Sequence, residues 1–345
     1  MRQFLRRVAR RYPEAGTITL VFLISLVFTG MTQGLWLSVG NLQSLSQLTA
    51  VLAIMSFGEA MVIATGEIDI SVGSTFGIGA LTFLGLAPTL GSGPALVAAL
   101  LSGILIGALN GIFVALIGIP SLIVTLGTLF LFQGVAYAVT SGFSFAATSA
   151  VRKQFIYNAI GGGNVGTINV AVVWMLWILI LLQLVVFEMP VGNRILAVGG
   201  DAASSYSRGV NVARIKSGVY VVSGLLAAFA GVLDAANIGY ADGSFGASME
   251  LSAIAAAVLG GCRLTGGRIS LVGTLLGAFV LRGIQSFLII LGVQPQWYIL
   301  VLGLIVVLAS LADRALRGLA LKKQRTRQSS PPIGCGKQPR RRLFG

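Results

Sequence analysis

The sequence predicts an all-α fold, a polytopic bundle of about ten transmembrane segments with both termini in the cytosol. Of its 345 residues, 56% are hydrophobic and only 10% are charged, whereas a soluble domain carries about 25% charged residues. Apolar runs of about twenty residues recur along the chain, and this is the length that crosses a bilayer as a helix. The formal net charge is +14, and its excess lies outside the apolar runs.

The basic residues at the two ends predict the topology. Five arginines precede residue 12, and ten Lys or Arg residues follow from Arg314 onward. Such a bias keeps a flanking segment in the cytosol. We therefore expect a basic cytosolic N-terminal segment (1–16), one transmembrane domain (17–313) and a basic, disordered cytosolic tail (314–345) that anionic membrane lipid attracts.

Apolar runs and polar interruptions define the expected spans. In chain order these are residues 17–37, 45–65, a Gly-rich segment ending near Pro88, 95–118, 121–140, 171–187, 217–236, the short segment 252–260, 269–291 and 297–312. The polar linker 141–167 is expected on the outer side. The linker 192–216 is expected in the cytosol because it carries Arg194, Arg208, Arg214 and Lys216.

A polar stretch, residues 66–74, interrupts the apolar segments and carries Glu67, Asp69, Ser71 and Ser74. A charged side chain at membrane depth is costly and normally faces a cavity or a partner inside the bundle. Glycine and serine let the backbone leave helical geometry, which a membrane tolerates only where protein or water satisfies the freed groups. The stretch therefore predicts a broken segment beside a polar path.

Two acidic residues each have two interpretations. Asp69 either caps the start of a broken helix, where unpaired N–H groups favour a carboxylate, or lines a path together with Ser74 and Asn110. Glu250 is either a helix-start carboxylate or a contact at a gate. Asn110 lies beside a GxxxGxxxG face formed by Gly103, Gly107 and Gly111, which predicts close helix packing.

The composition excludes several classes of chemistry. The chain has no histidine, so it cannot build a Ser-His-Asp triad or a histidine-based zinc site. It also lacks the GxxxxGK[ST] loop that cradles phosphates, and no basic surface interleaved with aromatics indicates a nucleic-acid partner. We expect no enzyme, no catalytic residue, no metal and no cofactor. Any ATPase must be another chain. A proton-coupled carrier with Glu59, Glu67 and Asp69 as its relay is the alternative.

Four stretches resemble a known family. They are residues 65–73 (TGEIDISVG), 197–201 with 209–212 (AVGGD and GVNV), 219–228 (VYVVSGLLAA), and 250–261 followed by 264–268 and 273–278 (ELSAIAAAVLGG, LTGGR and GTLLGA). In this order they resemble the permease subunits of bacterial sugar ATP-binding-cassette (ABC) importers of the ribose, xylose and galactoside type. The resemblance covers residues 41–313.

The resemblance implies a multi-pass protein of the bacterial cytoplasmic (inner) membrane that carries a monosaccharide or related polyol. Its expected partners are an ABC ATPase, a second permease copy that makes a homo- or heterodimer, and a sugar-binding protein on the outer face. The linker 192–216 would then be the coupling loop to the ATPase, with Arg194, Gly199, Asp201, Gly209 and Asn211 as its candidate residues. Which sugar is carried stays open.

The chain departs from the family pattern at a few positions. Ser252 stands where the family usually has Asp, Ser204-Ser205 where it has Ala-Ala, and Tyr206 where it has Arg. These departures bear on the details of the contact with the ATPase more than on the class of protein.

Overall fold

The computed structural model describes residues 15–294, 296–305, 307 and 308. The tail expected over 314–345 therefore lies outside the described residues, as does almost all of the N-terminal segment expected over 1–16.

Within the described residues, seven helices are long and apolar enough to cross a membrane. They are α3 (Val39–Ala64), α4 (Val72–Leu90), α5 (Ser92–Gly111) with its π-helical continuation η2 (Ile112–Ile117), α6 (Ser121–Thr140), α9 (Val170–Phe187), α12 (Val212–Ile238) and α14 (Leu271–Ile290). The prediction of an all-α, polytopic membrane protein is thereby confirmed.

Three further helical segments match the remaining predicted spans. Two are shorter apolar helices, α2 (Ala15–Met31) and α13 (Met249–Leu259). The third covers residues 297–305, 307 and 308, within the predicted span 297–312. The count of about ten membrane crossings and the cytosolic placement of both termini stay predictions.

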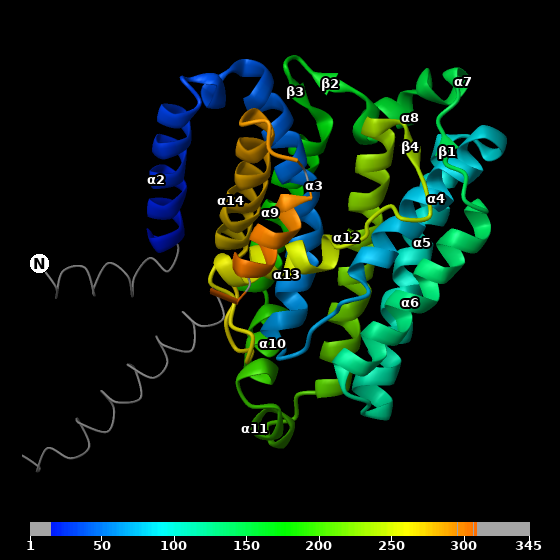
Figure 1. Cartoon of the computed structure of the whole chain (residues 1–345). Coiled ribbons are helices and arrows are strands. Elements are labelled where there is room, and N and C mark those ends of the chain that lie inside the picture. Colours follow the sequence, from blue (N-terminus) through cyan, green and yellow to red (C-terminus); the bar gives the residue numbers. More distant parts are fainter. Residues whose placement is uncertain (1–14, 295, 306, 309–345) are drawn as a thin grey trace, which may run out of the picture.

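Short elements gather at the two ends of the bundle (Figure 1). The upper end in this view carries α7 (Ser149–Arg152), α8 (Phe155–Tyr157), the π-helical turn η3 (Asn158–Gly162) and the strands β1 (Phe145–Ala146), β2 (Asn164–Val165), β3 (Ile168–Asn169) and β4 (Tyr240–Ala241). Strands β1 and β4 pair antiparallel, with Phe145 opposite Ala241, and β2 pairs antiparallel with β3. The 3₁₀ turn η1 (Leu35–Leu37) joins α2 to α3.

The predicted linker 192–216 lies at the opposite, lower end, but it is largely helical (Figure 1). It forms most of α10 (Pro190–Gly200), all of α11 (Ala202–Ser207) and the first turn of α12. Pro190 starts α10 at its first helical turn, which suits proline because that position needs no N–H. Asp201 and Asn211 then cap α11 and α12 with their side-chain oxygens. The sequence interpretation as a loop missed these helices, which are too short for hydrophobic periodicity to reveal.

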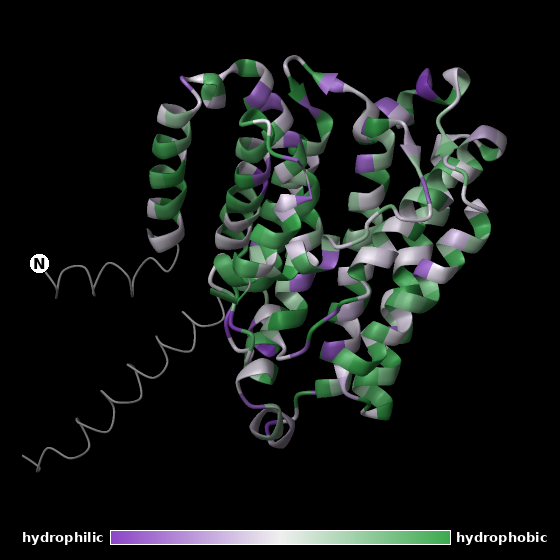
Figure 2. Cartoon of the chain, viewed as in Figure 1, coloured by the Kyte–Doolittle hydropathy of each residue, from purple (hydrophilic) through white to green (hydrophobic). Residues whose placement is uncertain are grey.

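The core is centred on α3. Its residues from Thr49 to Ala64 are all buried, and α9, α12, α13 and α14 pack around it. Large apolar side chains such as Leu105, Phe130 and Ile180 are exposed instead on α5, α6 and α9. Figure 2 shows the same division, with hydrophobic residues along the sides of the bundle and hydrophilic residues toward its ends. A protein whose sides face lipid has this pattern.

Glycines bring α5 and α12 into backbone contact. A Cβ added to Gly103 would lie 2.4 Å from the Gly224 oxygen, and one added to Gly107 would lie 2.3 Å from the Tyr220 oxygen. One added to Gly111 would lie 2.8 Å from Ser217 Cα. The close packing predicted from the GxxxGxxxG pattern is confirmed, and it fixes Asn110 inside the bundle, where it is fully buried.

Candidate functional site

The chain leaves helical geometry between the end of α3 at Ala64 and the start of α4 at Val72. Gly66 has φ +85°, a left-handed conformation that glycine adopts without the steric penalty of a side chain. The segment 65–71, here called the α3–α4 break, then carries Glu67, Asp69 and Ser71 toward α4. It joins two helices of the bundle core.

Asp69, Ser71 and Asn110 form one buried hydrogen-bonded cluster. The Ser71 N–H and hydroxyl both donate to Asp69 Oδ1, over 3.0 Å and 2.6 Å. Asn110 Nδ2 donates to Ser71 Oγ over 2.7 Å and approaches Asp69 Oδ1 at 3.5 Å. Asp69 is only 1% exposed. Its carboxylate thus closes a turn two residues ahead of α4 and links that turn to α5, as a carboxylate near a helix N-terminus can.

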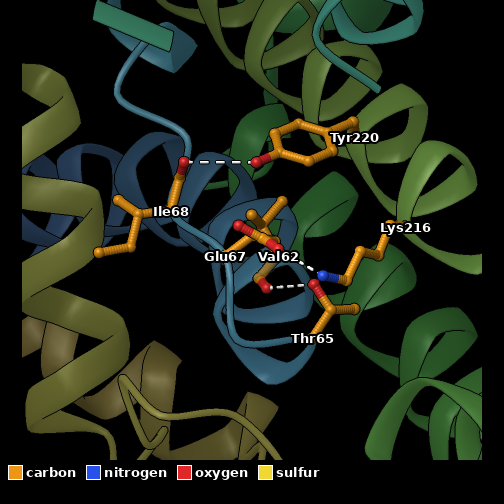
Figure 3. A network of polar contacts seen from close by, with 6 residues as sticks. All are labelled: Val62, Thr65, Glu67, Ile68, Lys216 and Tyr220. Atoms are coloured by element: carbon orange, nitrogen blue, oxygen red, sulfur yellow. Dashed lines mark hydrogen bonds and ion pairs between the residues drawn. The ribbon is translucent and has the colours of Figure 1, made fainter. Parts of the chain in front are cut away.

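Glu59 lies directly behind this cluster. Its Oε1 accepts the Asp69 backbone N–H over 3.2 Å, while its Oε2 has no hydrogen-bond partner among the described residues. Glu67 is directed elsewhere, because it forms an ion pair with Lys216 at the start of α12 (Figure 3). Of the three acids in the proton-relay alternative, the structure therefore brings Glu59 and Asp69 together and pairs Glu67 with a base.

The same face of α12 holds the break at a second point. Tyr220 donates its hydroxyl to the Ile68 carbonyl oxygen over 3.4 Å, one turn beyond Lys216 (Figure 3). The lower half of α12 thus contacts both Glu67 and Ile68. A displacement of the start of α12 would be transmitted directly to the α3–α4 break.

Ser74 and Glu250 meet at a small cavity of about 40 Å³ above this cluster. The cavity lies between the first turns of α4, the middle of α6 and the segment 243–248 that leads into α13. Glu250 occupies the first turn of α13 and is 9% exposed. Gln133 of α6 also lines the cavity.

The five candidate coupling residues lie in α10, at the cap before α11 and in the turn between α11 and α12. Arg194 is exposed on α10, while Gly199 is packed against the end of α3. Asp201 caps α11 by accepting the Ser204 N–H over 3.0 Å and the Ser204 hydroxyl over 2.7 Å. These bonds, the first of them above all, hold the pKa of the Asp201 carboxyl below its usual range. Gly209, at φ +83°, ends α11, and Asn211 caps α12 by accepting the Arg214 N–H.

Gly199 is the point where this segment meets the core. A Cβ there would lie 1.8 Å from the Ala64 carbonyl oxygen and 2.6 Å from the Gly267 nitrogen. Gly267 N–H itself donates to that Ala64 oxygen over 2.9 Å. Three segments, α10, the end of α3 and the turn between α13 and α14, therefore cross at backbone contact. We call this crossing the glycine junction (Gly199, Ala64 and Gly267).

Sequence reasoning used Lys216 only for topology and Gly267 only in a family-like stretch, and it did not name Gln133. The signal for Lys216 is that an acid inside a membrane bundle requires a partner, and Lys216 borders the next buried helix. The signal for Gln133 is a carboxamide in the middle of an apolar span. Among the residues that the structure describes, no group of three or more acids, cysteines or histidines is arranged to hold a metal ion.

Interrupted helices inside a bundle of apolar helices are typical of membrane transporters, and in this chain a helical projection packs where α3 ends. The chain belongs to the family described as "Branched-chain amino acid transport system / permease component", which matches residues 41–310. It is a multi-pass membrane permease of the ABC transporter class. It matches no solved structure.

Curated relatives are similar over nearly their whole length. The chain is 36% identical over 307 residues to the ribose import permease protein RbsC of Escherichia coli (strain K12), covering 87% of this chain and 93% of that protein. It is 30% identical over 360 residues to the xylose transport system permease protein XylH of the same strain, covering 87% and 91%. It is 33% identical over 324 residues to the autoinducer 2 import system permease protein LsrC of Escherichia coli O157:H7, covering 92% of each.

Proposed function

We propose that this chain is the permease subunit of an ABC importer for a monosaccharide or a related polyol, and that it forms the translocation path. The similarity to permeases named for ribose and xylose supports this substrate class. The cytoplasmic membrane of a bacterium is the location that fits such a subunit. Energy would come from a separate ABC ATPase, because the chain has no phosphate-cradling loop of its own.

The observation that carries the proposal is the glycine junction. The helices α10 and α11 project from the lower end of the bundle (Figure 1), and Gly199 seats α10 directly on the carbonyl of Ala64. The α3–α4 break starts at the next residue. A force applied to α10 and α11 would thus reach the break without passing through a flexible linker. This is the arrangement that residues 192–216 need in order to couple an ATPase to the path.

The outer surface of this projection is suited to a protein partner. Tyr206 of α11 is 75% exposed, and an exposed aromatic side chain is typical of the centre of an interface. Together with Asn211 and Ala115 it borders an open hollow of about 770 Å³. We propose that the ATPase docks here, with Tyr206 and Arg194 among the contacts.

We propose a second permease copy because the segment 242–248 is non-helical and partly exposed. The segment 242–248 runs from β4 back to α13 in the middle of the bundle (Figure 1), and Ser244 and Ala247 are exposed. Leu251 of α13 is 45% exposed beside them. Non-helical backbone at membrane depth is tolerated only against protein or water. A second permease copy across this face would supply both, and a sugar-binding protein would dock at the outer mouth of the path.

Co-purification tests the proposal. The full chain, tagged and extracted in mild detergent, is expected to bring down an ATPase with a Walker A motif, identified by mass spectrometry. Asp201→Ala is expected to weaken this association because it removes the cap of α11. Asp242→Ala is the matched control, since Asp242 makes the same bonds to Ser244 outside the predicted coupling segment. A chain that purifies without any ATPase would contradict the proposal.

A further inference from the structure

The cavity beside Glu250 lies where two interrupted helices begin. The helix α4 starts at Val72 after the α3–α4 break, and α13 starts at Met249 after the segment 242–248. Gly246 brings these starts together, because a Cβ on Gly246 would lie 2.4 Å from the Gly73 carbonyl oxygen. Each helix N-terminus carries unpaired N–H groups and a partial positive charge. Both first turns border the same cavity.

Glu250 is the charged group of this cavity and its carboxylate is incompletely bonded. A Cβ on Gly73 would lie only 2.1 Å from Glu250 Oε2, so the carboxylate lies directly against the first turn of α4. Oε2 has no hydrogen-bond partner among the described residues, although the side chain is only 9% exposed. A buried, unsatisfied carboxylate oxygen is costly. In another state, the hydroxyl group of a ligand could donate the missing hydrogen bond to this oxygen.

The remaining polar groups of the cavity suit hydroxyl groups. Ser74 supplies a hydroxyl and Gln133 a carboxamide, from α4 and α6 respectively. A sugar hydroxyl is both a donor and an acceptor, so it can donate to Glu250 while it accepts from Gln133. Besides Ser74, the α4 wall of the cavity consists of Gly73 and Gly77, which have no side chains. These groups could exchange bonds with successive hydroxyls of a passing sugar.

The cavity is too small for a sugar, so the structure shows a closed state of this site. About 40 Å³ holds water, which needs at least about 10–15 Å³, but it does not hold a monosaccharide. Passage therefore requires α6 or the segment 242–248 to move away from α4. Ser248, the residue directly before α13, has φ +64°, a conformation that is strained for a residue with a side chain. Movement of the segment 242–248 at Ser248 could relieve this backbone strain.

We propose that Glu250, Ser74 and Gln133 form a sugar-contacting constriction, closed in this structure, through which the hydroxyls of a monosaccharide pass. This inference rests on the proposed function and adds to it the residues that touch the sugar. This constriction differs from the Asp69 cluster, because Asp69 Oδ1 already accepts two hydrogen bonds from Ser71 within the protein.

The test uses the full chain with its co-purified ATPase and binding protein in proteoliposomes, with radiolabelled D-ribose and D-xylose as probes. Uptake of each sugar and ATP hydrolysis are measured for Glu250→Gln, Ser74→Ala and Gln133→Ala. Glu188→Gln and Ser102→Ala are the matched controls, because Glu188 is exposed and Ser102 bonds only within α5 in the structure.

We expect Glu250→Gln to lower uptake about tenfold, the loss of one charged hydrogen bond, while ATP hydrolysis stays within about twofold of the unsubstituted chain. We also expect Gln133→Ala and Ser74→Ala to change the ratio of ribose to xylose uptake, which a purely structural role would leave unchanged. Unchanged uptake and an unchanged ratio in all three variants would overturn the inference, as would a parallel loss of uptake, ATP hydrolysis and thermal stability. If the unsubstituted chain shows no ATP-dependent sugar uptake, the proposed function fails first.

Discussion

Lys216 forms an ion pair with Glu67, and this pair joins the first turn of α12 to the α3–α4 break. The two residues are 149 positions apart in the sequence. Their side chains are 19% and 17% exposed, so water reaches the pair without separating it. The glycine junction joins α10 to Ala64, the residue before the break, and this ion pair joins α12 to the break itself.

The ion pair predicts an effect on coupling that exceeds its effect on folding. A partly exposed pair contributes at most about 1 kcal/mol to stability, so Lys216→Ala should change thermal unfolding little. We expect sugar uptake per ATP hydrolysed to fall about fivefold, which corresponds to about 1 kcal/mol. Exchanging the charges with Glu67→Lys and Lys216→Glu together should restore part of the loss. Lys153→Ala, at an exposed site, is the control. Equal uptake in all these variants would contradict the prediction.

The glycine junction predicts that alanine substitutions at two neighbouring glycines, Gly199 and Gly200, differ sharply in their effect on stability. Gly199→Ala places a Cβ against two backbone atoms, whereas a Cβ on Gly200 meets nothing within 4 Å. We expect Gly199→Ala to destabilise the protein by about 2 kcal/mol or to shift α10, because backbone cannot yield as a side chain can. Gly200→Ala should stay within about 0.5 kcal/mol. Thermal unfolding in detergent compares the two, and indistinguishable midpoints would show that α10 is not seated as described.

Asp69 offers a test between its two interpretations. Asp69→Ala leaves the Ser71 N–H and hydroxyl without their acceptor inside the bundle, and we expect at least about a tenfold loss of uptake. Asp69→Asn keeps an oxygen acceptor for the turn and should retain part of the activity if the carboxylate caps α4. Initial uptake rates at matched membrane expression decide this. Full activity of Asp69→Ala would exclude both the capping and the path-lining role.

The cap on α11 predicts a pH dependence with a defined sign. Because the folded-state pKa of Asp201 is lowered, its contribution to α11 is present above the ordinary aspartate pKa of about 3.9 and is lost as the pH falls through the lower folded-state value. We expect the protection factors of the amides over residues 202–207, measured against the unstructured exchange rate at the same pH, to fall in that acidic range, and at neutral pH in Asp201→Ala. Asp201→Asn should protect these amides at both pH values, since asparagine also caps helices. Protection factors that do not change with acidification in the unsubstituted chain would refute this.

Composition and apolar run length were sufficient to predict the class of fold. They also located the polar stretch 66–74 and the short helix that carries Glu250, because both interrupt or shorten an apolar run. The helices α10 and α11 escaped prediction because local signals, Pro190 at the start of α10 and the Asp201 cap of α11, determine where they begin, not hydrophobic periodicity.

The partners inside the candidate site could not be predicted from one sequence. Lys216 meets Glu67, and Gln133 and Glu250 line the same cavity, only because segments far apart in the sequence pack together. The glycine junction depends on backbone approach between segments far apart in the chain. A glycine in a chain with 46 of them gives no sign of which neighbour it will meet.

The central claim is that this chain is part of an ATP-driven sugar importer. Measuring sugar uptake with different energy sources tests it most directly. Proteoliposomes would contain this chain with its ATPase, enclose ATP and face the sugar-binding protein outside, with radiolabelled D-ribose and D-xylose as the sugars. We predict uptake of at least one sugar that requires both enclosed ATP and the binding protein, and that a protonophore leaves unchanged. Uptake that proceeds without ATP and stops when the proton gradient is collapsed would contradict the importer and favour a carrier with Glu59 and Asp69 in its relay.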